Sequence, residues 1–136
     1  RSPSRGLGDV YKRQILNSGR PPKKYIISQR LWDSHKARKS KNKKAGKGFG
    51  YSLKTANDEY TNTISARYYK DGAEILIKRR NHDIPRKLTP DEARQLQGFP
   101  SNFIVNNSDV QAYKQFGNAV SVPVVRELSK RILKFI

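Results

Sequence analysis

The sequence predicts an α+β fold in which a basic helix and a small twisted β region precede three short C-terminal helices. Three features support this prediction: a capped, lysine-rich run at 29–44, β-favouring residues on both sides of an Asp-Gly pair, and dense helix start and stop signals from Arg86 to Pro123. The 136 residues suffice for one ordinary domain or for part of a larger one.

The composition is strongly basic. The 29 Lys and Arg residues outnumber the 11 Asp and Glu residues, and the formal net charge is +18. A positive field of this size calls for an anionic partner, and nucleic acid is the default expectation. A membrane is not expected, because no apolar run approaches the ~18 residues that a spanning helix needs. A general nucleic-acid protein of ribosomal type would explain the charge equally well.

The sequence contains no cysteine, which excludes disulfides, thiolate metal sites and a cysteine nucleophile within these residues. The two histidines, His35 and His82, stand far apart in the sequence. Neither is expected to act in catalysis, and no metal site is predicted. No signal peptide is visible, so we expect a cytoplasmic location.

Residues 1–14 differ from the rest of the chain. They are rich in Gly, Ser and Pro, lack hydrophobic periodicity and start without methionine. They resemble a translated adapter sequence, so we expect an adapter-derived or disordered tail and exclude it from the fold prediction. A natural flexible tail is the alternative. In the first case, we expect an N-terminal part of the protein to be missing.

A helix is predicted from Gln29 to about Lys44, with Ser28 as its N-cap and Gly46 at its end. Between Arg20 and Lys54, twelve Lys and Arg residues accompany a single acid. Contacts from such a stretch to phosphates would give DNA affinity that depends on salt and not on base sequence. A solvated charged face is the alternative.

The middle of the chain reads as a turn followed by a β-hairpin. The glycine-rich run 46–51 carries Phe49 and Tyr51, and its spacing does not fit a dinucleotide-binding loop. Thr63–Tyr68 and Ala73–Ile77 are predicted strands, and Lys70, Asp71 and Gly72 are the predicted turn.

The C-terminal helices carry clear boundary signals. Thr89 to Glu92 form a predicted capping box with proline at the first helical position, and that helix should stop at Gly98. Asp91 and Glu92 are thereby explained as capping acids. A second helix is expected from Ser108–Asp109 to Phe116, with Gly117 as its C-cap.

A third helix is expected from Val122 to the end of the chain. Its apolar residues recur at the spacing of one helix face: Val124, Val125, Leu128, Ile132, and Phe135 or Ile136. This spacing is typical of a helix face that is buried against other elements.

Several of these residues resemble conserved motifs of the DNA cytosine-5 methyltransferase family. RKLTP at 86–90 with EARQLQGFP at 92–100 is similar to the ninth motif, and YKQFGNAV at 113–120 with Pro123 is similar to the tenth. Thr63–Tyr68 is similar to the Thr-Leu-containing strand of the family's target-recognition domain. The resemblance implies three parts: the tail at 1–14, a target-recognition domain at 15–85, and a closing segment at 86–136.

The closing helices would complete the edge of a Rossmann-like domain that uses S-adenosylmethionine. Because the sheet of that domain would lie outside this chain, the apolar face of the last helix should be exposed when the chain is isolated. The resemblance places Asn118 and Ala119 near the amino-acid end of this cofactor. The partner would be double-stranded DNA with one cytosine flipped out of the duplex, in a restriction-modification setting. Arg86 would anchor the ninth motif and belongs to the candidate DNA-binding set, which comprises Thr63, Ser65, Arg67, Tyr68, Lys70 and Arg86.

The family's catalytic residues are not expected in this chain. Family members attack cytosine with a cysteine, and neither the cysteine nor the early motifs are present here. The chain alone should therefore be inactive, although the full protein would be a methyltransferase. Two explanations stay open: a truncated piece of a longer enzyme, or a non-catalytic DNA-specificity subunit that works with a separate catalytic subunit.

Overall fold

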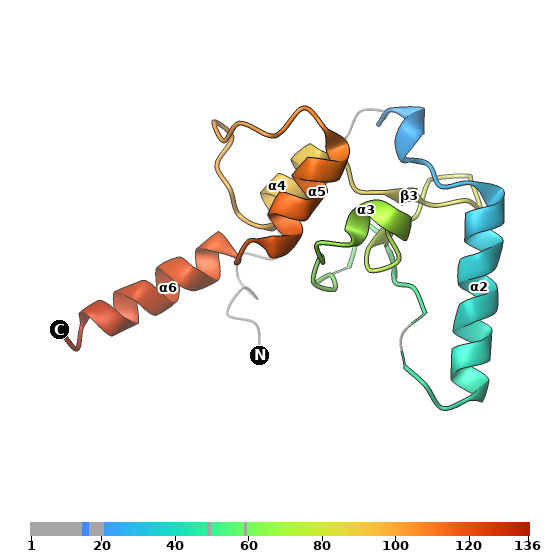
Figure 1. Cartoon of the computed structure of the whole chain (residues 1–136), viewed down its shortest axis with the longest axis horizontal. Helices are drawn as coiled ribbons and strands as arrows, with labels where there is room; N and C mark the ends of the chain where they lie inside the picture. Colours follow the sequence, from blue (N-terminus) through green and yellow to red (C-terminus); the bar gives the residue numbers. More distant parts are fainter. Residues whose placement is uncertain (1–14, 17–20, 49, 59) are drawn as a thin grey trace.

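The computed structural model describes residues 15–16, 21–48, 50–58 and 60–136. The predicted tail at 1–14 and Phe49 lie outside these residues. Figure 1 shows a central body of short elements with one long helix at either side. The elements are η1 (Lys23–Tyr25), α2 (Gln29–Lys44), β1 (Leu53–Lys54), α3 (Tyr68–Asp71), β2 (Leu76–Ile77), β3 (Arg86–Lys87), α4 (Pro90–Leu96), α5 (Asp109–Asn118) and α6 (Val122–Leu133).

The sheet is small and mixed, and its order is β1-β2-β3. Strand β2 pairs with β1 in parallel and with β3 in antiparallel orientation, so that Leu76 lies between Leu53 and Lys87. An isolated bridge joins Ile26 to Arg86. The α+β prediction is confirmed at this level.

The predicted β-hairpin is wrong. Residues 63–67 form no strand, and Tyr68–Asp71 form the single turn of α3. Gly72 adopts a left-handed conformation with φ of 65° and ends this turn, so the Asp-Gly pair is a helix terminus instead of a hairpin loop. Strand β2 instead pairs with β1, 23 residues earlier, and with β3, at least nine residues later. The side chain of Tyr68 lies in the core.

Helix α2 has the predicted bounds. The Ser28 hydroxyl accepts a hydrogen bond from the Leu31 amide at 3.1 Å, and Gly46 follows the helix with φ of 66°. Trp32 and His35 are its buried residues. His35 Nε2 donates to the Asp71 carbonyl at 3.2 Å, so this histidine holds α2 to α3.

Helix α5 runs two residues beyond its predicted end, and Gly117 lies within it instead of capping it. The reason for glycine is close packing. A Cβ at Gly117 would overlap the carbonyl of Ser65 and the amide of Ala66. The backbone of α5 therefore touches the 65–66 backbone directly, which a larger residue would prevent.

Helix α6 projects away from the body (Figure 1) and contains no buried residue. Its apolar face is open to solvent, as expected: Val124 is 48%, Leu128 53% and Ile132 59% exposed.

One hydrophobic core spans the predicted boundary between residues 85 and 86. It joins Tyr68 and Ile75 on one side of this boundary to Tyr113 and Phe116 on the other. The two predicted parts thus pack as one body, and their assignment to different domains of a longer protein stays a prediction.

Candidate DNA and cofactor interface

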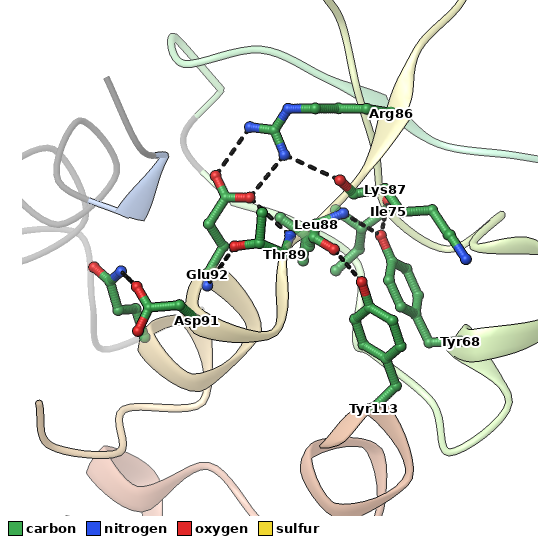
Figure 2. Close-up of polar contacts among 10 residues, drawn as sticks. Tyr68, Ile75, Arg86, Lys87, Leu88, Thr89, Asp91, Glu92 and Tyr113 are labelled. Carbon is green, nitrogen blue, oxygen red and sulfur yellow. Dashed lines mark hydrogen bonds and ion pairs between the residues drawn. The ribbon is translucent and has the colours of Figure 1, made fainter. Parts of the chain in front are cut away.

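A buried ion pair lies at the centre of the molecule (Figure 2). Arg86 donates to both carboxylate oxygens of Glu92, from Nη1 at 2.7 Å and from Nη2 at 2.9 Å. Glu92 also accepts from the Thr89 amide, and the Thr89 hydroxyl accepts from the Glu92 amide, which completes the predicted capping box. The sequence explained Glu92 as a cap, but its pairing with Arg86 was not anticipated.

This geometry favours a structural role for Arg86. The residue is 6% exposed, and its guanidinium is occupied by Glu92 and by the Lys87 carbonyl. It anchors β3 to α4, as its place in the motif implies, and it does not lie on an open surface.

Two tyrosines hold the backbone between β3 and α4 (Figure 2). Tyr68 accepts from the Leu88 amide and donates to the Ile75 carbonyl, while Tyr113 donates to the Leu88 carbonyl. The centroids of their rings lie 5.1 Å apart, in an edge-to-face arrangement. Burial raises the pKa of both phenols well above 10, so both hydroxyls stay protonated and can donate.

The candidate DNA-binding residues at 63–70 fall into two groups. Thr63, Arg67 and Lys70 are exposed. Tyr68 is fully buried, and the Ser65 hydroxyl donates to the Glu74 carboxylate. The exposed three are therefore available to a ligand, whereas the other two support the segment from within.

The candidate cofactor-binding residues adjoin this segment. Asn118 is exposed and Ala119 is half-buried at the end of α5. Because Gly117 packs on the backbone of Ser65 and Ala66, the predicted DNA segment and the predicted cofactor residues meet at one place. The contact between α3 and α5 extends this meeting point into the core.

Gln97 was missed in the sequence. It is 8% exposed, and its Nε2 donates to the Phe116 carbonyl at 2.6 Å and to the Ala119 carbonyl at 3.4 Å. The backbone carbonyl of Gln97 accepts a hydrogen bond from the Val122 amide at 3.0 Å. Gln97 thus holds the segment at 119–121, which joins α5 to α6 directly after Asn118. A glutamine next to the glycine that ends a predicted helix is the sequence signal that could have indicated this role.

Within the described residues, no group of three His, Asp or Glu side chains could hold a metal ion. In the same part of the chain, no helix has the length and apolar character to cross a bilayer.

Two bacterial type II methyltransferases are similar in sequence to most of this chain. A Lactococcus lactis protein, the type II methyltransferase M1.ScrFI, is 60% identical over 111 residues, which cover 82% of this chain and 28% of that protein. The type II methyltransferase M.SsoII of Shigella sonnei is 54% identical over 127 residues, which cover 93% of this chain and 32% of that protein. The chain thus spans about a third of the length of these relatives.

Solved structures agree in fold. A Schizosaccharomyces pombe Dnmt2 methyltransferase superposes with a TM-score of 0.72 at 17% identity, over 90% of this chain and 41% of that one. The Entamoeba histolytica methyltransferase EhMeth gives a TM-score of 0.67 at 22% identity, over 88% of this chain and 39% of that one.

The family model for C-5 cytosine-specific DNA methylases matches residues 6–134. This match begins inside the segment at 1–14, whose assignment as a tail stays a prediction. Together with the identities above, it extends well beyond the two motifs first noted in the sequence. The chain belongs to the C-5 cytosine-specific DNA methylase family.

Proposed function

We propose that this chain is the C-terminal part of a restriction-modification DNA cytosine-5 methyltransferase. In this role, residues 15–85 read DNA and residues 86–136 close the cofactor side of the enzyme. The observation that carries the proposal is the packing of Gly117 on the Ser65–Ala66 backbone. This contact joins the candidate DNA segment to the candidate cofactor residues, as an enzyme that transfers a group from cofactor to DNA requires.

DNA contacts in this proposal come from the exposed residues of the segment. Arg67 and Lys70 supply cations for phosphates or for guanine in a groove, and Thr63 supplies a hydroxyl. Ser65, Tyr68 and Arg86 keep the segment and the sheet in place. The substrate would be double-stranded DNA with a flipped cytosine, inside a bacterial or phage-infected cell.

Cofactor contacts come from the end of α5. S-adenosylmethionine would supply the methyl group when bound, with most of its pocket built by residues outside this chain. The exposed Asn118 amide offers both a donor and an acceptor, which suits the ammonium and carboxylate groups of an amino acid. The half-buried Ala119 would offer only its backbone, and Gln97 holds its carbonyl.

The apolar face of α6 would cover the edge of a Rossmann-like sheet. Val124, Leu128 and Ile132 are each about half exposed in this chain, which is costly for a stable free surface. A contact with the rest of the methyltransferase would bury them and would complete the fold.

Methyl transfer by this chain alone is not expected, because the sequence lacks the cysteine that the family uses. The chain would act together with the catalytic part, either within one longer protein or as a DNA-specificity subunit of a split enzyme. Both versions assign the same work to the residues described here.

Mixing experiments test the proposal. The purified chain should bind duplex DNA but should transfer no methyl group from S-adenosylmethionine. Addition of the Lactococcus lactis relative without its matched segment should restore transfer, and Asn118→Ala in this chain should raise the KM for the cofactor. Transfer by the chain alone would contradict the assigned roles, as would an Asn118→Ala variant that behaves like the wild type.

A further inference from the structure

Beyond Arg30 in its first turn, helix α2 carries its positive charges in two groups that differ in their surroundings. The inner group lies next to the body of the molecule and consists of Lys36, Arg38 and Lys39. The outer group occupies the last turn and consists of Lys41, Lys43 and Lys44, which we call the distal lysines. Only the inner group is explained by contacts within the chain.

The inner cations stabilise the attachment of α2. Lys36 lies 5.3 Å from the centre of the Trp32 ring, and Lys39 lies 4.2 Å from that of Tyr51. Arg38 donates to the Gly50 carbonyl at 3.2 Å and pairs with Asp71 at 3.6 Å. These charges therefore have a structural explanation.

The charges of the distal lysines have no structural explanation of this kind. In the described ranges, no side chain pairs with Lys41, Lys43 or Lys44, and all three are exposed. Lys39 and Lys43 stand four positions apart, and Lys41 and Lys44 three, so that like charges are neighbours on the helix surface and repel one another. The helix dipole favours each cation in the last turn, but it does not remove the repulsion between neighbouring lysines.

The distal lysines would lengthen the DNA-contacting surface that begins at the candidate residues 63–70. Asp71 ends α3 and binds both His35 and Arg38, so the middle of α2 is attached beside Lys70. From Arg38 to Lys44 the helix advances by about 9 Å, and Figure 1 shows α2 running along one side of the molecule. Its distal end can therefore reach DNA phosphates beyond those near α3.

We propose that the distal lysines form a second phosphate-binding site, which contacts the DNA backbone flanking the methylation target. This site rests on the proposed DNA-binding function, and its ligand is the phosphate of double-stranded DNA. It adds affinity and orientation without reading bases, because lysine binds a phosphate as a point charge.

A charge-matched pair of variants tests the site. The triple variant Lys41→Gln, Lys43→Gln and Lys44→Gln removes three charges from α2. The control variant, Arg126→Gln, Lys130→Gln and Lys134→Gln, removes three exposed charges from α6 and its C-cap residue, on the other side of the molecule (Figure 1). Both retain a net charge of +15, since +18 minus 3 is +15. Circular dichroism checks that each keeps its helices.

Duplex affinity is measured by fluorescence anisotropy between about 50 and 200 mM salt. Each lost phosphate contact makes the slope of log K against log salt less steep by ~0.9. The slope should therefore decrease in magnitude by about 2–3 for the α2 variant and by less than ~1 for the α6 variant. Equal losses in both variants would show a diffuse effect of net charge and would overturn the site. Absence of salt-dependent binding by the wild type would overturn the proposed DNA-binding function itself.

Discussion

Replacement of Glu92 by glutamine would test how much the buried ion pair stabilises this fold. The carboxylate accepts two hydrogen bonds from Arg86 and one from the Thr89 amide, at 2.7–2.9 Å. Glutamine keeps an oxygen for the Thr89 amide and remains compatible with a capping box. What it removes is the negative charge beside a guanidinium that is only 6% exposed.

The expected loss follows from that burial. A buried charge that loses its partner destabilises a protein by about 3–5 kcal/mol, compared with a total stability of about 5–15 kcal/mol for a typical domain. Urea denaturation of the full chain, followed by far-UV circular dichroism, would measure this difference. The double variant Arg86→Met with Glu92→Gln removes both charges of this ion pair, and it should be more stable than the Glu92→Gln variant.

Asp91→Asn provides the matched control. Asp91 lies on the same turn of α4, but its carboxylate is half exposed. Solvent therefore screens its pair with Arg94, and Asp91→Asn should cost less than Glu92→Gln. If Glu92→Gln cost no more than Asp91→Asn, or if the effects of the Arg86 and Glu92 changes simply added, the ion pair would not hold β3 to α4 in the manner described.

Three further outcomes are expected. Gly117→Ala should destabilise the chain by more than 1 kcal/mol, because a methyl group would overlap backbone and not a movable side chain; an unchanged urea midpoint would contradict the close packing. Gln97→Met should cost about 1–3 kcal/mol and should speed amide hydrogen exchange at residues 119–122, whereas Gln95→Met, at a less buried site, should do neither. Burial raises the pKa of Tyr68 and Tyr113, so unfolding releases protons above pH ~10 and stability should fall as pH rises through that range. A Tyr113→Phe variant should lose part of this pH dependence, and an unaltered profile would contradict burial of that phenol.

Several elements could be predicted because their signals lie within a few residues of one another. Ser28 caps α2 and Gly46 ends it, and the Thr89–Glu92 capping box starts α4, as local hydrogen bonding requires. The family motifs were equally local, and matches along the chain now support them. The apolar face of α6 followed from helical spacing, and its exposure was expected because the family resemblance implies a partner sheet outside this chain.

The tertiary structure decided the rest, because the deciding partners are far apart in the sequence. Residues 63–67 have strand-like character, but Tyr68 must bond the backbone of Ile75 and Leu88 inside the core, and this favours a helical turn. Gly117 looked like a helix end, and only the approach of the 65–66 backbone shows why it must lack a side chain. Local sequence thus determined where the longer helices α2, α4, α5 and α6 begin. Long-range packing determined the helical turn of α3 and which residues meet at the proposed DNA and cofactor interface.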